Sequence, residues 1–218
     1  MKVPDYARYD YVNRKAVEFL EKYEIHSFPV NPHRIINAEK WEVEKYSELM
    51  KRFKCNLAIV ARCLGSGDGY TVYNDSNFTI AYNDVSKPEG RVRFTLMHEI
   101  GHIYLGHLTD FNKTQIRRNE LSRGEYRVLE NEANAFARNV LIPTVILRET
   151  LKAEPTVEQL AELFGVTESA VNARLDFYQT DSSKNSQNQL NGRLRNIYIN
   201  FHQAKKRDRK MITEVTFN

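Results

Sequence analysis

The motif His98-Glu99-Ile100-Gly101-His102 lies in a stretch from about Arg91 to Leu108 that we expect to form one long helix. Residues four apart share a helix face, so both imidazoles can bind one zinc ion while Glu99 faces the water on that ion. Zinc polarises a peptide carbonyl and acidifies its bound water, and a neighbouring carboxylate can remove the water's proton. The motif therefore predicts zinc ligands at His98 and His102 and a catalytic base at Glu99.

A catalytic zinc ion needs a third protein ligand and leaves its fourth position to water. A second helix is predicted from about Glu125 to Leu141, and Glu132 lies inside its apolar stripe, which consists of Leu129, Ala133, Phe136 and Val140. A buried carboxylate is costly unless it is paired or binds a metal, which makes Glu132 the predicted third ligand. The alternative for Glu132 is an ordinary salt-bridged residue. The competing ligand is Glu130, whose face carries Tyr126 and Asn134 and has a more solvated character.

Two other kinds of zinc site are disfavoured. A metzincin would continue as HxxGxxH, but here Leu105 stands where the glycine should be, and His107 comes one position too early. A structural site usually has four protein ligands with cysteine prominent, whereas Cys55 and Cys63 form no CxxC pattern. Both cysteines are expected to be reduced and buried.

The rest of the chain predicts an α+β fold. An amphipathic helix is expected from Tyr6 to Tyr23, and a short helical stretch after Pro32 ends near Phe53. Runs rich in β-branched and aromatic residues predict a small, mainly antiparallel sheet, with strands at 56–62, 70–73 and 78–82. Small residues at Gly101 and Ala133 would let the two long helices approach closely.

Composition and charge describe a folded protein with a basic tail. The chain has 41% hydrophobic and 28% charged residues, and neither an export signal nor a membrane-spanning run is recognised, so we expect a cytoplasmic protein. From Gln179 onward there are eight Lys and Arg against three Asp and Glu, a net charge of +5 in a chain whose total is +4. The run Lys205-Lys-Arg-Asp-Arg-Lys210 is more typical of a solvated tail than of a nucleic-acid site.

Two motifs together resemble the ImmA/IrrE family of metallopeptidases: Arg93-Phe-Thr-Leu-Met-His-Glu-Ile-Gly-His102, and Glu132-Ala-Asn-Ala-Phe-Ala137 followed by Leu141-Ile-Pro143. The resemblance covers about residues 55–178. It implies a zincin-like fold in which His98, His102 and Glu132 bind Zn²⁺ and Glu99 is the base. It also implies a protein substrate inside the cell, a helix-turn-helix repressor of a mobile element, phage or stress locus. By analogy with zincins, the strand at 78–82 is nominated as the sheet edge that binds substrate.

The family often carries a helix-turn-helix-like segment after the peptidase domain, and residues 157–175 resemble one, with two short helices joined at Gly165-Val166-Thr167. The presumed recognition helix offers Glu168, Ser169, Asn172 and a single basic residue, Arg174. Phosphate attraction would be poor, so packing or repressor docking is favoured over DNA binding.

The predicted organisation has three parts. Residues 1–150 form the zincin-like metallopeptidase domain, 151–178 the helix-turn-helix-like segment, and 179–218 a polar and basic extension. The predicted function is zinc-dependent endoproteolysis of a regulatory protein. The alternative is a DNA- or repressor-binding regulator with a vestigial, non-catalytic metal site.

Overall fold

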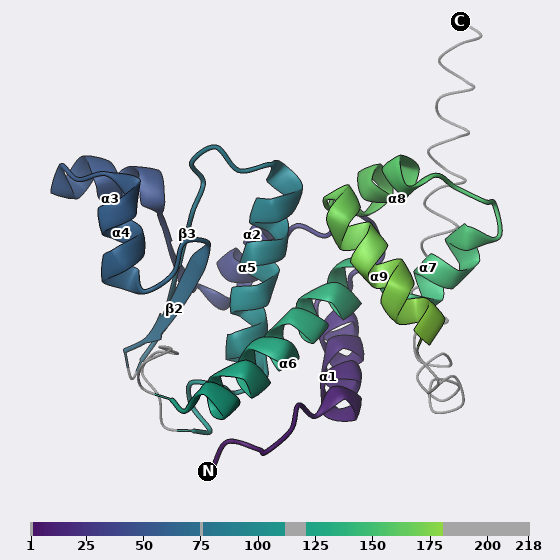
Figure 1. Ribbon diagram of the computed structural model, residues 1–218, viewed down its shortest axis with the longest axis horizontal. Helices are drawn as coiled ribbons and strands as arrows, with labels where there is room; N and C mark the ends of the chain where they lie inside the picture. The colour runs from purple at the N-terminus through teal and green to yellow at the C-terminus, as the bar shows by residue number, and fades with distance from the viewer. Residues whose placement is uncertain (1, 75, 112–120, 181–218) are drawn as a thin grey trace, which may run out of the picture.

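The computed structural model describes residues 2–74, 76–111 and 121–180 (Figure 1). Those residues form, in chain order, α1 (Tyr9–Lys22), α2 (Pro32–Glu39), β1 (Glu42–Lys45), α3 (Tyr46–Phe53), α4 (Leu57–Leu64), β2 (Gly69–Tyr73), β3 (Phe78–Tyr82), α5 (Glu89–Tyr104), α6 (Arg123–Leu141), α7 (Thr144–Leu151), α8 (Val157–Phe164) and α9 (Glu168–Thr180). The predicted α+β class is confirmed. Most of the predicted extension, residues 181–218, lies outside the described residues.

The sheet has the strand order β1-β3-β2. β2 and β3 form the predicted antiparallel hairpin, and β1 pairs with β3 in parallel. The sequence Glu42-Val-Glu-Lys45 offers one apolar residue and suits a charged edge strand, which is why no strand was expected there. Because β3 lies between β1 and β2, the prediction that residues 78–82 offer a free edge is wrong. The edge on the side of α5 is β2.

The predicted strand at 56–62 is a second correction, because these residues form helix α4. The side chain of Asn56 accepts a hydrogen bond from the backbone N–H of Ile59, which caps the helix N-terminus. Gly65 ends the helix with φ +74°, the left-handed conformation that favours glycine. Two good caps outweigh the strand preference of Ile59 and Val60, and Val60 packs beneath Tyr46 of α3.

The long helices α5 and α6 cross at the centre of the molecule, with the sheet on one side of α5 and α1 against α6 (Figure 1). A Cβ atom at Gly101 would lie 3.1 Å from Cδ1 of Phe136 and 3.4 Å from the carbonyl oxygen of Ala133. The predicted close approach of α5 and α6 at these small residues is therefore confirmed. It brings polar side chains of α6 within reach of the histidines of α5.

Helices α8 and α9 share the main hydrophobic core with the rest of the fold. A Cβ atom at Gly90, where α5 begins, would lie 2.7 Å from the backbone carbon of Val166, so the turn between α8 and α9 rests directly on α5. Arg174 is 2% exposed and donates hydrogen bonds to the carbonyl oxygen of Ile142 (3.1 Å) and to Oγ1 of Thr144 (2.6 Å). The single basic side chain of α9 is thus used for packing. The boundary at residue 150 stays a prediction.

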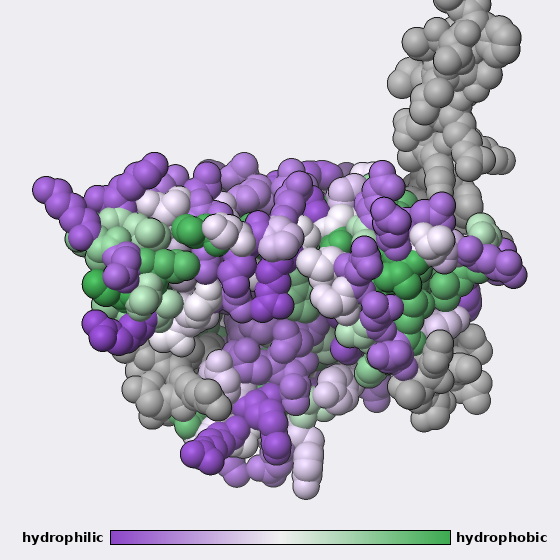
Figure 2. Space-filling model, turned by 45° about the horizontal axis from the view of Figure 1, so that its top comes forward, coloured by the Kyte–Doolittle hydropathy of each residue, from purple (hydrophilic) through white to green (hydrophobic). Residues whose placement is uncertain are grey.

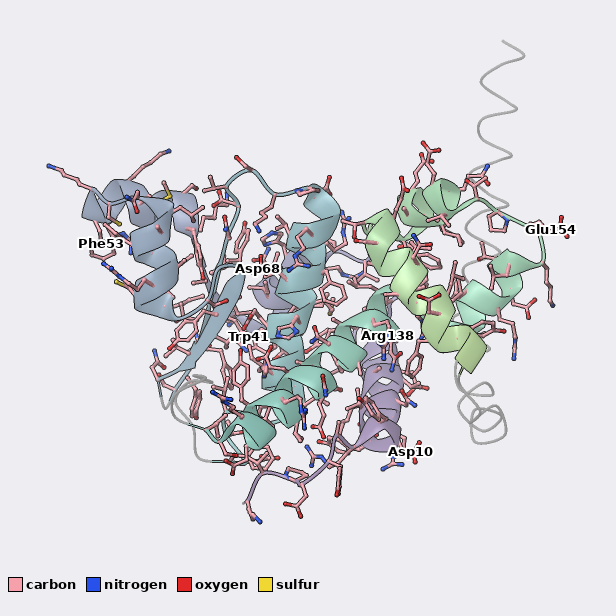
Figure 3. The ribbon with its side chains drawn as sticks, in the orientation of Figure 1. Asp10, Trp41, Phe53, Asp68, Arg138 and Glu154 are labelled. Carbon is pink, nitrogen blue, oxygen red and sulfur yellow. The ribbon has the colours of Figure 1, made fainter. Side chains whose placement is uncertain are left out.

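Two other sequence expectations concern exposure. Within the described residues, no helix combines the length and apolar character that a membrane crossing requires. Cys63 is exposed and Cys55 half-buried, so the expectation that both are buried is wrong. Phe53, at the end of α3, is exposed as well (Figure 3). Like the two cysteines, it lies in the segment formed by α3 and α4.

Candidate metal centre

The side chains of three potential metal ligands, His98, His102 and Glu130, converge where α5 crosses α6. Nε2 of His98 and Nε2 of His102 lie 3.1 Å apart, as expected for residues one helical turn apart on α5. Each Nε2 lies 3.5 Å from a different carboxylate oxygen of Glu130, which projects from α6. These atoms form the group of potential metal ligands found within the described residues.

Glu132, the predicted third ligand, does not join this group in the structure. Its side chain points to the other side of α6, where it is fully buried. It accepts hydrogen bonds from Nε (2.9 Å) and Nη2 (2.8 Å) of Arg8 and from the Arg8 backbone N–H (2.7 Å). Glu132 is therefore a salt-bridged residue, as the alternative interpretation expected. The positive charge of Arg8 offsets the free-energy cost of burying this carboxylate.

Further hydrogen bonds orient the converging groups. Nδ1 of His98 lies 3.0 Å from Oδ1 of Asn134, and Nδ1 of His102 lies 2.9 Å from Nδ1 of His107. A hydrogen bond from Tyr126 reaches Glu130. With their Nδ1 atoms engaged in this way, both imidazoles turn Nε2 toward Glu130.

Electrostatics keep the two histidines neutral and the carboxylate charged. Burial lowers the pKa of His98 to about 4, helped by the neighbouring His102, and burial also lowers the pKa of His102. For Glu130, burial alone would raise the pKa, but the contacts with His102 and His98 and the hydrogen bond from Tyr126 lower it to about 2. Neutral imidazoles and an ionised carboxylate are the protonation states that bind a metal ion.

Glu99 lies beside this group on α5 with its carboxylate against β2. Oε2 accepts a hydrogen bond from Oγ1 of Thr71 at 2.6 Å, and the residue is 6% exposed. Burial raises the pKa of Glu99 to about 8, against the opposing effect of the Thr71 hydrogen bond. A carboxyl group with a raised pKa, held next to potential metal ligands, is suited to accepting and returning a proton.

A cavity of about 340 Å³ opens onto these groups. The loop before β2 and β2 itself form one wall, α5 the floor and α6 the other wall, and Asp68 lies on the β2 side (Figure 3). Figure 2 shows hydrophilic side chains gathered around the middle of this face, with a hydrophobic patch over α3 and α4 beside them. The cavity is therefore an accessible polar cleft between the sheet and α6.

The HExxH motif predicts His98, Glu99 and His102, whereas the sequence pattern of α6 favours Glu132 over Glu130. The signal that could have found Glu130 is the spacing of Tyr126, Glu130 and Asn134, which are four residues apart and form a polar face directed at the cleft. No local signal pointed to Arg8 or His107. Their contacts with Glu132 join parts of the chain that are far apart in sequence.

Comparisons with known proteins agree with this geometry. The sequence model of the Peptidase_M78 family, described as the IrrE N-terminal-like domain, matches residues 52–176, which is more than half of the chain. No curated protein matches the chain closely enough to count as a relative. The fold, with a small sheet beside the helix that carries the histidines, is the zincin-like arrangement that the resemblance implied. The chain belongs to the ImmA/IrrE family of metallopeptidases.

Proposed function

We propose that this chain is a zinc-dependent endopeptidase of the cytoplasm that hydrolyses a peptide bond in a regulatory protein. The observation that carries the proposal is the convergence of His98, His102 and Glu130 beside the buried carboxylate of Glu99. Family membership supports the substrate class, a helix-turn-helix repressor of a mobile element, phage or stress locus.

The spacing of the three donors fits zinc. Two ligands about 2.0–2.1 Å from a tetrahedral ion should lie about 3.3–3.4 Å apart. Here the two imidazole nitrogens lie 3.1 Å apart, and each lies 3.5 Å from one of the two Glu130 oxygens. With one ligand atom taken from each residue, the three atoms lie within 4.8 Å of one another, close enough for a small shift of Glu130 to bring them onto one ion. Two imidazole nitrogens and one carboxylate oxygen are also a known ligand set for catalytic zinc, with the fourth position left to water. We therefore assign the third ligand to Glu130.

When bound, zinc supplies a Lewis acid that polarises the scissile carbonyl and acidifies a water molecule. Glu99 takes the proton of the attacking water and delivers it to the leaving amine. Thr71 holds one carboxylate oxygen of Glu99, leaving the other free for this proton transfer.

Substrate is proposed to bind as an extended strand along the free edge of β2. The backbone hydrogen bonds from Asn83 to Asp68 and from Asn74 to Asn77 fix the alternation of the β2–β3 ladder. It follows that the backbone N–H and C=O groups of residues 69, 71 and 73 point away from β3. No strand among residues 2–74, 76–111 and 121–180 pairs with that edge, so it is suited to β-augmentation by a peptide.

A second cavity, of about 250 Å³, continues the cleft toward α9. It shares Arg91, Phe94 and Asn134 with the first and extends past Arg138, which lies near α9 in Figure 3, to Ala170. Its lining includes the apolar residues Phe94, Leu141, Ile142, Val166, Ala170 and Ala173. We propose that it receives an apolar side chain close to the cleaved bond.

The regulator alternative has less support. Arg174 is buried, and the neighbouring exposed side chains of α8 and α9 include Glu158, Glu162 and Glu168, which repel phosphate. The contacts of α8 and α9 with α5 instead place these helices at the end of the cleft.

The test combines a substrate search with metal removal. The zinc-loaded chain is incubated with a proteome-derived peptide library and with purified helix-turn-helix repressors, and new termini are identified by mass spectrometry. Cleavage should stop when a chelator removes zinc, return when zinc is added, and show an apolar residue near the cleaved bond. Intact substrates in every incubation, with zinc occupancy verified, would contradict the proposal.

Replacing Gly69 with Ala should lower kcat/KM by roughly 10- to 100-fold, because small displacements of a catalytic group are costly. A Cβ atom there would lie 2.6 Å from Cγ2 of Thr95 and 2.8 Å from Oε1 of Glu99, so the carboxylate or β2 must move. Zinc binding should persist. Gly67→Ala is the matched control, because a Cβ atom at Gly67 meets nothing within 4 Å. Equal activity of the two variants would show that Gly69 does not set the position of Glu99.

A further inference from the structure

A continuous chain of side-chain contacts runs from the metal site to the start of α1. Nδ1 of His102 lies 2.9 Å from Nδ1 of His107, and Nε2 of His107 lies 3.1 Å from Oε2 of Glu132. Glu132 in turn accepts three hydrogen bonds from Arg8. His107 and Glu132 are both fully buried, so solvent does not interrupt the chain.

The proton positions along this chain follow from the chemistry of its members. With Nε2 of His102 committed to the metal site, the proton of its neutral ring must be on Nδ1, which donates to Nδ1 of His107. His107 then carries its own proton on Nε2, which donates to the carboxylate of Glu132. Glu132 can only accept, and Arg8 can only donate. Each of the hydrogen bonds therefore has one allowed direction.

We propose that Arg8, Glu132 and His107 form a relay that fixes the tautomer and orientation of His102 and so strengthens zinc binding. The proposal rests on the proposed function, because it takes His102 as a zinc ligand. His107 and Glu132 are positioning residues: they act through His102 and do not touch the reacting atoms. Partners of this kind typically change metal affinity by about 10- to 100-fold.

The two histidine ligands have different hydrogen-bond partners at Nδ1. His98 donates from Nδ1 to the neutral amide oxygen of Asn134, whereas the chain from His102 ends at an ion pair. A carboxylate at the end of the chain makes the ligating nitrogen of His102 more basic than a neutral partner would. Through Arg8, the residue immediately before α1, the N-terminal part of the chain contributes to the metal site although it lies outside residues 52–176.

Zinc affinity of the folded protein tests the relay. Dissociation constants are measured by competition with a chromophoric chelator for the full chain and for Glu132→Gln, Arg8→Met and Arg8→Lys, at a temperature where circular dichroism shows each variant folded. Glu132→Gln and Arg8→Met should weaken zinc binding about 10-fold or more. Arg8→Lys, which keeps the charge, should recover part of the loss.

Matched controls remove ion pairs elsewhere. Glu39→Gln breaks a carboxylate contact with Lys22 and Tyr23, and Arg52→Met breaks the pair with Glu44. Neither should change zinc affinity. If Glu132→Gln and Arg8→Met lower the unfolding temperature but keep wild-type zinc affinity, the contacts only support the fold and the relay is overturned.

The tautomers give a second readout. In zinc-loaded protein with ¹⁵N-labelled histidine, long-range ¹H–¹⁵N spectra should show the ring proton of His107 on Nε2 and that of His102 on Nδ1. A proton on Nδ1 of His107 would overturn the relay even if a variant failed to fold. Loss of zinc binding by the wild-type chain would instead overturn the proposed function, so the two failures are distinguishable.

Discussion

Replacing Glu99 with Gln is expected to reduce kcat/KM for peptide hydrolysis by about 10²- to 10⁴-fold, the usual contribution of a general acid–base group. The amide has the shape of the carboxylate and can accept the hydrogen bond from Thr71, so the fold and the cleft should be retained. It cannot take a proton from water at neutral pH. The measurement is steady-state kinetics on the substrate found in the cleavage search, with elemental analysis to confirm unchanged zinc content.

Glu89→Gln is the matched control for this prediction. Glu89 is the first residue of the same helix α5, and its side chain is 84% exposed and pairs with Arg93. This variant should keep full activity. If Glu99→Gln were as active as Glu89→Gln while both held zinc, Glu99 would not be the base, and another proton acceptor in the cleft would have to be sought.

Replacing Glu130 with Gln is expected to raise the zinc dissociation constant by more than the roughly 10- to 100-fold typical of an indirect partner, because it removes a ligand charge. The ionised carboxylate lies 3.5 Å from Nε2 of both histidines, and an amide is a weaker zinc ligand. The hydrogen bond from Tyr126 can still be accepted, so the change is confined to the metal site. Chelator competition measures the affinity.

Glu132→Gln is the matched comparison for Glu130→Gln, because Glu130 and Glu132 are close together on α6 but contact different partners. Assignment of Glu130 as the ligand requires the larger loss of affinity in Glu130→Gln. It also requires the larger loss of folding stability in Glu132→Gln, which breaks a buried ion pair with Arg8. The opposite order of zinc affinities would return the ligand role to Glu132.

The local sequence of α6 does not show which of Glu130 and Glu132 lies beside the histidines of α5. Glu132 lies in an apolar stripe and is buried as its position predicts, and a buried carboxylate must be compensated. The compensating group, however, is Arg8, 124 residues away in sequence. Nothing local to α6 distinguishes compensation by a distant arginine from compensation by a metal ion.

The strands illustrate the same limit. The hairpin of β2 and β3 was predictable because its turn residues and strand residues are adjacent in sequence. The sequence does not indicate β1, because its pairing with β3 is parallel and non-local. Residues 56–62 are not the predicted strand, because the helix caps Asn56 and Gly65 outweigh the β-branched residues between them. The central position of β3 could not be known before β1 was placed.

The sequence by itself determined the α+β class, the HExxH helix with His98, Glu99 and His102 on it, and the close approach of α5 and α6 at Gly101. These features depend on periodicity, spacing and side-chain size, which are properties of neighbouring residues. Only the tertiary structure decided which glutamate of α6 lies beside the histidines and which strands form the edges of the sheet. It also decided that Arg8 and His107 both contact Glu132. Those outcomes depend on how each helix is rotated about its axis and in which order the strands pair when distant segments pack. A buried charge is stabilised by whichever partner the fold places beside it, and that partner can be far away in sequence.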